Sequence, residues 1–128
     1  MFKKLILVGL SISCFYTSIL FAQSKEQIGI KLAECSAYNS HAFTIAIKIF
    51  KDNKMMQERK LLMEQNWDFA DKLIGKTQAN EVILNTSKLA RTYQNDTQAY
   101  VNFVGKNIQD CDNFVINNSS IIKRALSQ

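Results

Sequence analysis

The sequence contains no proline and only four glycines in 128 residues, and three of these glycines (Gly29, Gly75 and Gly105) follow residue 24. A β-sandwich or barrel of this length needs many tight turns, which are usually made by proline, glycine and similar residues. Their scarcity argues against a turn-rich β fold. It favours a few long helices joined by short connections.

Residues for catalysis are also scarce. His41 is the only histidine, and there is no Gly-x-Ser-x-Gly motif, no glycine-rich phosphate loop and no Cys-x-x-Cys-His haem motif. A nucleophile with its base and orienting group cannot be assembled from these residues, and Glu-x-x-His pairs for a di-metal centre are missing. Glu64, Asp68 and Asp71 share one face of a predicted helix, where a solvated surface is expected rather than a cation site. We expect a protein without enzymatic activity, metal or cofactor.

Positive charge is not concentrated in any block. Residues 25–128 contain 14 Lys and Arg against 11 Asp and Glu, and the longest basic runs are the pairs Arg59-Lys60 and Lys123-Arg124. Nucleic-acid binding usually requires a basic patch or stripe. The sequence therefore predicts no nucleic-acid partner.

The first 24 residues have the layout of a secretory signal peptide. Lys3 and Lys4 precede an apolar run over residues 5–22, and small residues stand at Ala22 and Ser24. We therefore predict a signal peptide over 1–24, a helical bundle domain over 25–128, and a periplasmic or secreted bacterial protein. The run is short and diluted for a membrane span, so no stable membrane insertion is expected after cleavage.

Several points about this segment stay open. Cleavage after Ser24 fits the small-x-small rule, whereas cleavage after Ala22 leaves Ser24 to form a helix-capping box with Gln27. Two alternatives are an uncleaved N-terminal anchor and a lipoprotein cut before Cys14.

Two cysteines remain after the signal, Cys35 and Cys111. An even number of cysteines in an oxidising compartment predicts a disulfide, which here closes a loop across 76 positions. The chain-entropy model gives such a bond about 4 kcal/mol of stabilisation. The alternatives are two buried thiols or a disulfide between two chains.

Four amphipathic stripes follow the signal. They cover residues 28–50, 55–74, 79–104 and 108–126, with breaks expected at 51–54, Gly75 and Gly105. A strand over 43–50 is the alternative for the end of the first stripe. Asn95-Asp96 is expected to kink or interrupt the third stripe, and residues 117–120 favour a break within the last.

These stripes predict an all-α fold, a single four-helix up-down bundle. In such a bundle the first and last helices are antiparallel neighbours. Cys35 and Cys111 lie on their apolar faces at similar depth, so an intrachain disulfide between them is geometrically reasonable.

Phe69, Phe103 and Phe114 lie outside the apolar stripes, and exposed aromatic side chains often mark interaction surfaces. Our first functional hypothesis is a non-catalytic protein that binds an unknown protein partner, as an inhibitor, adaptor or chaperone, and is itself a monomer or homodimer. The second is a small-molecule or cofactor carrier with a ligand between the helices. The ligand would then lie near His41, Met55, Met56 and Trp67.

Overall fold

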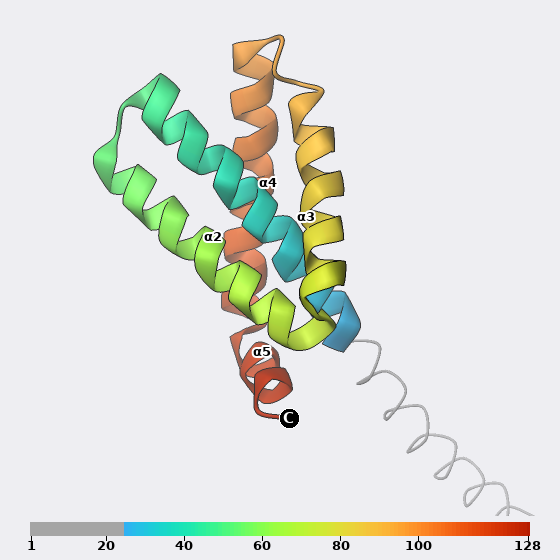
Figure 1. The fold of residues 1–128 in the computed structure, drawn as a ribbon. Helices are drawn as coiled ribbons and strands as arrows, with labels where there is room; N and C mark the ends of the chain where they lie inside the picture. Colours follow the sequence, from blue (N-terminus) through green and yellow to red (C-terminus); the bar gives the residue numbers. More distant parts are fainter. Residues whose placement is uncertain (1–24) are drawn as a thin grey trace, which may run out of the picture.

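The computed structural model describes residues 25–128, which are helical with no strand (Figure 1). An N-terminal helix over 25–45 continues into the π-helix η1 (Ala46–Phe50), followed by α2 (Asn53–Ile74), α3 (Lys76–Arg91), α4 (Thr97–Asn117) and α5 (Ser119–Leu126). The predicted signal peptide lies outside the described residues. None of the helices within 25–128 is long and apolar enough to cross a bilayer.

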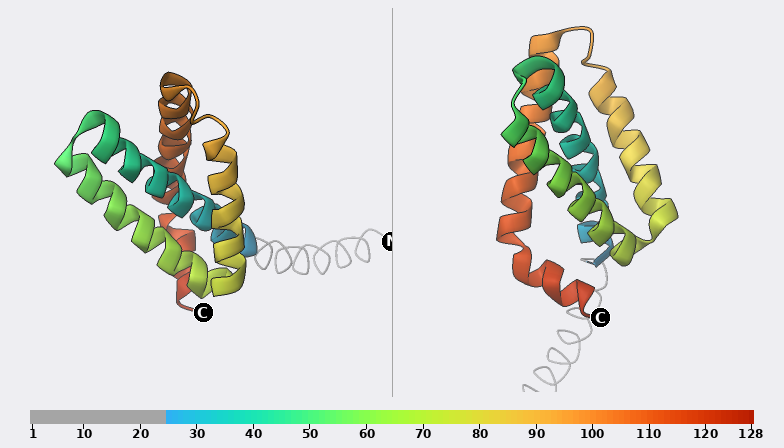
Figure 2. Two further views of the ribbon diagram at one scale, coloured as in Figure 1. Left: turned by 45° about the horizontal axis from the view of Figure 1, so that its top comes forward. Right: turned by 60° about the vertical axis from the view of Figure 1, so that its left-hand side comes forward.

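The predicted all-α, up-down architecture is confirmed. The N-terminal helix, α2, α3 and α4 run in alternating directions, and α5 turns away from the end of α4 to contact α2 (Figure 1). The helices form two hairpins, and the one made by the N-terminal helix and α2 lies across the one made by α3 and α4 (Figure 2). Within residues 25–128 the short helix α5 follows the predicted four, after the break expected at 117–120, and the π-helix η1 ends the first of them.

Side-chain caps set two of the helix starts. The carboxylate of Asp52 accepts a hydrogen bond from the Met55 amide, and that of Asp96 accepts one from the Ala99 amide, both at 3.0 Å. Each bond satisfies one of the free amides at a helix N-terminus. Gly75, with a positive φ of 84°, joins α2 to α3 as its position in the sequence predicted.

The expected end of the third helix at Gly105 is wrong. The helix α3 ends at Arg91, and Gly105 lies inside α4, which begins at Thr97. The interruption expected at Asn95-Asp96 is confirmed, because a loop over residues 92–96 separates α3 from α4, and the capping carboxylate of Asp96 fixes the new helix start. The expected break near residue 118 is confirmed, because Asn118 separates α4 from α5.

The core consists of two buried clusters. One surrounds the disulfide between Cys35 and Cys111, whose Cα atoms are 5.5 Å apart, and joins the N-terminal helix to α4. The other, which includes Ile28, Leu32 and Ile122, lies where the N-terminal helix, α2, α3 and α5 meet. The predicted intrachain disulfide is therefore confirmed, and it ties the first long helix to the last.

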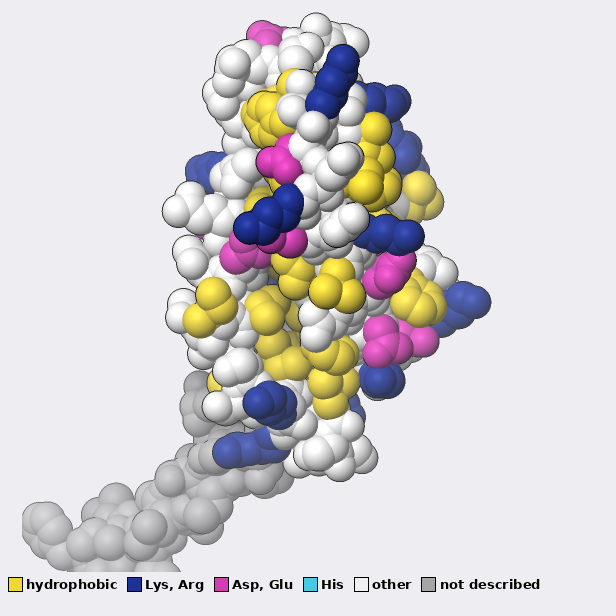
Figure 3. Space-filling view, turned by 90° about the vertical axis from the view of Figure 1, so that its left-hand side faces the viewer, with side chains coloured by type: hydrophobic (Ala, Val, Ile, Leu, Met, Phe, Trp, Pro, Cys, Tyr) yellow, Lys and Arg dark blue, Asp and Glu magenta, His cyan; other side chains and the backbone are white. Residues whose placement is uncertain are grey.

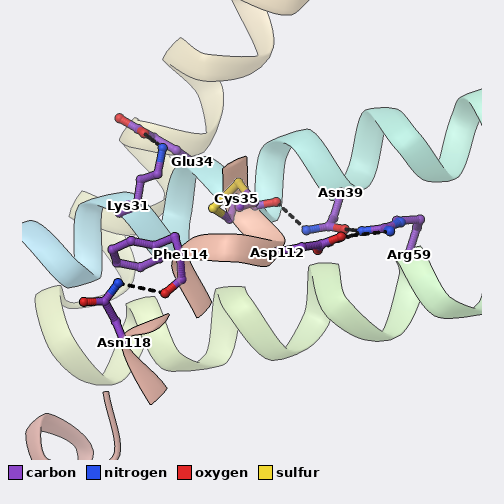
Figure 4. The surroundings of a disulfide bond; sticks show 9 residues. Lys31, Glu34, Cys35, Asn39, Arg59, Asp112, Phe114 and Asn118 are labelled. Atoms are coloured by element: carbon purple, nitrogen blue, oxygen red, sulfur yellow. Dashed lines mark hydrogen bonds and ion pairs between the residues drawn. A yellow bond between two sulfur atoms is a disulfide. The ribbon is translucent and has the colours of Figure 1, made fainter. Parts of the chain in front are cut away.

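A polar network lies beside the disulfide. Arg59 of α2 donates to the carboxylate of Asp112 on α4 and to the side-chain oxygen of Asn39. The amide group of Asn39 in turn donates to the Cys35 carbonyl at 2.8 Å (Figure 4). The network connects three helices at the level of the disulfide.

The end of the first hairpin differs from the predicted stripe. Ile49 and Phe50 were expected to face the core, but they are 40% and 53% exposed. The last turn of the helix widens into η1, and the extra residue in a π-turn shifts the side chains that follow it. Ile47 is also exposed, at 43%, so the helix ends in an apolar surface.

Candidate binding groove

A hollow of about 550 Å³ lies between the N-terminal helix, α2 and α3. We call it the groove. It is lined by two serines, a methionine, an isoleucine, the only tryptophan, an asparagine and two acidic residues: Ser36, Ser40, Met63, Glu64, Trp67, Asp68, Asn80 and Ile83.

Small side chains on the N-terminal helix help to make this hollow. Ser36 and Ser40 lie one turn apart on the same face of the helix. The buried Ser36 hydroxyl donates a hydrogen bond to the Met63 carbonyl of α2 at 2.9 Å. This bond holds α2 against the N-terminal helix and uses the polar group of Ser36.

Trp67 spans the groove from α2 to α3. Its indole N–H donates to the side-chain oxygen of Asn80 at 2.9 Å, and the ring is half-buried. The bond fixes the ring orientation and satisfies its one polar atom. Together with Met63 and Ile83, the ring gives the groove a mainly apolar interior.

The rim of the groove carries negative charge. Glu64 is exposed, and in the described part of the chain no lysine or arginine lies within ion-pair distance of it. Asp68 forms an ion pair with Lys72 at 2.9 Å, but both side chains are more than half exposed, so the pair is weak. A ligand with positive charge beside an apolar part would suit this rim.

His41 lies apart from the groove. It is buried against Tyr100 and hydrogen-bonded through Nδ1 to the tyrosine hydroxyl. Burial, with a smaller effect of the nearby Arg91 charge, lowers the pKa of His41 below its usual 6.5, so the ring is neutral at pH 7. Burial also raises the pKa of Tyr100 above its usual 10.0. The pair joins the N-terminal helix to α4.

The residues considered for a ligand between the helices are not all brought together. Trp67 lines the groove, whereas His41 contacts Tyr100. Met55 lines a separate cavity of only about 90 Å³ near Arg59. The methionine that lines the groove is Met63, which lies one turn before Trp67 on α2.

The three phenylalanines predicted as an interaction surface are all half-buried. Phe69 and Phe114 pack against the cluster that contains Ile28, while Phe103 packs against the disulfide cluster. Phe103 stacks on Tyr93, with ring centroids 4.2 Å apart and planes at 13°. The structure therefore brings Phe69 and Phe114 to one cluster and places Phe103 at the other.

Most of the groove has no signature in the sequence. Ser36 and Ser40 come from the N-terminal helix and Asn80 and Ile83 from α3, and neither pair carries a motif. One available signal was the surface of α2, where Met63, Trp67 and two acidic residues lie close together. The other was the pair of small residues one turn apart on the first helix.

The fold and groove define a small disulfide-bonded helical bundle with a mainly apolar hollow on one side. Within residues 25–128 no group of three or more His, Cys, Asp or Glu is placed to hold a metal ion. Comparison of the chain with protein-family models, curated proteins and solved structures finds no match.

Proposed function

We propose that this protein is an exported, non-catalytic binding protein that holds an apolar segment of a partner protein in the groove. It would act as an inhibitor, adaptor or chaperone. The observation that carries this proposal is the groove itself, a mainly apolar hollow of about 550 Å³ with acidic residues at its rim.

The chemistry of the lining favours an apolar protein segment. Sites for small polar ligands present a few polar groups that are oriented toward the ligand and free to bond it. Here the Ser36 hydroxyl and the Trp67 N–H are both bonded within the protein. A helix with apolar side chains at i, i+3, i+4 and i+7 can bind in such a groove by burying its apolar face against the lining. A lysine or arginine beside those positions would pair with Glu64.

A small apolar molecule is the second candidate. The volume of the groove lies within the range of about 300–1,000 Å³ that is usual for small-molecule sites. We would therefore include a small apolar dye among the ligands tested.

Trp67 provides a direct readout, because it is the only tryptophan and lines the groove. We would titrate the protein with an amphipathic helical peptide carrying leucines at i, i+3, i+4 and i+7 and a flanking lysine. Saturable change in tryptophan emission is expected. A peptide of the same composition, with its leucines spread around the helix, should have little effect.

Two exposed glutamates on α2 give a matched pair of variants. Glu64 lines the groove and Glu58 does not, although both are exposed. Glu64→Lys should weaken binding of the lysine-bearing peptide several-fold and improve binding of a glutamate-bearing one, whereas Glu58→Lys should change neither. Equal effects of the two variants, or no saturable signal, would contradict the proposal. Saturation by a small apolar dye but by no peptide would favour the carrier.

Export is a separate part of the proposal. It is supported by the layout of residues 1–24 and by the disulfide, a bond that persists mainly in oxidising compartments. The intact mass of protein recovered from the exported fraction should lack residues 1–22 or 1–24. Recovery of the full chain would exclude cleavage.

A further inference from the structure

The end of the first hairpin combines exposed apolar and basic side chains. Ile47, Ile49 and Phe50 are 43%, 40% and 53% exposed. Lys48 stands between Ile47 and Ile49, Lys51 follows Phe50, and Lys54 comes three residues later; all three lysines are exposed. We call residues 47–54 the hairpin tip.

Further positive charge lies next to the tip. Lys48 and Ile49 line a hollow together with Gln94 and Thr97, so the loop between α3 and α4 is beside the tip. The last turn of α3, just before that loop, adds the exposed Lys88 and Arg91. Figure 3 looks toward the hairpin end, and hydrophobic and Lys or Arg side chains adjoin one another over its upper half.

The acidic side chains at this end are hydrogen-bonded to nearby backbone N–H groups. Its two acidic residues, Asp52 and Asp96, are both helix N-caps whose carboxylates accept backbone N–H groups. The tip, the last turn of α3 and the loop at 92–96 therefore hold five basic and two acidic residues, and the exposed Glu58 follows one turn after Lys54 on α2. Residues 25–128 hold 14 basic and 11 acidic residues, so the rest of the described chain is balanced at nine of each. The net positive charge is concentrated at this end.

The backbone conformation of Lys51 is unusual for a residue with a side chain. Its φ of 51° makes it the sole non-glycine residue with a positive φ among residues 25–128. A helix end in this conformation usually has glycine there, because a side chain is strained. The chain instead places an exposed lysine at this position of the tip.

We propose that the hairpin tip docks on the surface of a bilayer that contains anionic phospholipids. Ile47, Ile49 and Phe50 would enter the boundary between headgroups and acyl chains, and the lysines would contact lipid phosphates. Interfacial segments combine apolar and basic side chains in this way. The contact is peripheral and needs no spanning helix. It does not depend on the groove having a ligand.

Charge argues against a second copy as the occupant. A two-fold dimer through the tip would place the same patch against itself. The lysines of one copy would then face those of the other, and like charges oppose such a contact. An anionic bilayer offers negative charge and an apolar phase together, which matches both components of the tip.

The test is sedimentation with vesicles of phosphatidylglycerol and phosphatidylcholine, compared with phosphatidylcholine alone. Stronger binding to the anionic vesicles is expected, and it should weaken as salt is raised. Changing Lys48, Lys51 and Lys54 together to Gln should reduce the partition coefficient about a hundredfold, since each lysine near the surface contributes about fivefold. Ile47→Ser with Phe50→Ser should also reduce it, by about tenfold or more.

Two variants away from the hairpin tip serve as controls. Lys76→Gln changes an exposed lysine at the opposite end, where α2 meets α3 (Figure 1). Leu84→Ser changes a leucine that is 50% exposed on α3. Both should bind as the unmodified protein does. All variants keep the same N-terminal residues, so any contribution of residues 1–24 is common to them.

Quenching of a tryptophan placed in the tip reports whether the tip itself contacts the lipid. In Phe50→Trp, lipids brominated on their acyl chains should quench part of the tryptophan emission, whereas Trp67 in the unmodified protein should not be quenched. Tip variants that bind like the controls, equal binding to both vesicle types, or an unquenched Phe50→Trp would each overturn the proposal. So would competition by inorganic phosphate at equal ionic strength. Tip variants that abolish a dimer but leave vesicle binding intact would assign the tip to self-association instead.

Discussion

Arg59 and Asp112 form a forked ion pair that joins α2 to α4 beside the disulfide. The two terminal nitrogens of the guanidinium lie 3.1 and 3.2 Å from the two carboxylate oxygens. The Arg59 side chain is only 16% exposed, whereas that of Asp112 is 39% exposed. In the described part of the chain the remaining Nε of Arg59 is buried without a hydrogen-bond partner.

The exposures of the two side chains and the additional bond from Arg59 to Asn39 determine the cost of removing each partner. Asp112→Ala should lower the free energy of unfolding by about 1–2 kcal/mol, because it leaves a largely buried cation unpaired. Arg59→Met should cost no less, because the buried side-chain oxygen of Asn39 loses its donor, although the half-exposed Asp112 can be hydrated and the unpaired Nε is removed. Denaturant unfolding measures both, with Asp110→Ala as the exposed control on α4, expected within about 0.5 kcal/mol of the unmodified protein. An equal loss for Asp110→Ala would show that the pair has no special role.

The disulfide should make a large contribution to stability. Changing both Cys35 and Cys111 to Ala removes a bond that closes a loop of 76 positions, which is worth about 4 kcal/mol in the chain-entropy model. For a domain of this size the melting temperature should fall by more than about 10 °C. Calorimetry of the double variant, and of the reduced and alkylated protein, should agree. An unchanged melting temperature would rule out the stabilising role.

Two glycines should respond in opposite directions to the same change. A Cβ at Gly29 would overlap Cγ2 of Ile74, so Gly29→Ala should push the N-terminal helix away from α2 and destabilise the protein by about 1–3 kcal/mol. Gly105 lies inside α4 with open space around it, so Gly105→Ala should stabilise by about 0.5–1 kcal/mol. Thermal unfolding compares them directly, and a stabilising Gly29→Ala would contradict the packing described for these helices.

His41 should make stability depend on pH. Because burial lowers its pKa in the folded state, the unfolded chain takes up the proton first as pH falls. The stability contribution is complete above about pH 6.5, the usual value for histidine, and is lost as pH falls toward the folded pKa. The slope should be at most about 1.4 kcal/mol per pH unit.

Urea unfolding between about pH 5.5 and 7.5 tests this prediction, since most carboxyl groups titrate below that range. In His41→Gln the slope should disappear. A slope that persists unchanged in this variant would have to come from groups other than the histidine.

The sequence predicted the features that depend on periodicity and composition. The absence of proline and the amphipathic stripes indicated helices, and the cysteine positions indicated the disulfide between Cys35 and Cys111. The run Asn117-Asn118-Ser119-Ser120 indicated the break between α4 and α5, because such side chains compete for backbone hydrogen bonds. These signals are local, or rely on a simple rule of bundle topology.

Features that depend on tertiary geometry were not predicted. The interruption at Asn95-Asp96 was expected, but the helix end was placed too late, at Gly105, because Tyr93 within the loop and Tyr100 after it continue the apolar pattern. The exposure of Ile49 and Phe50 follows from a single widened turn, which has no signature in hydrophobic periodicity. The groove and the Arg59 pair bring together residues from separate helices, and their contacts depend on how the two hairpins cross.

The disulfide also determines how the chain would carry mechanical load. Tension applied between the two ends of the described chain would pass along residues 25–35, across the sulfur–sulfur bond and along residues 111–128. The hairpin tip and the groove-lining residues all lie within the bypassed segment 36–110. A pull on the termini would therefore leave both surfaces under no direct strain for as long as the bond is oxidised.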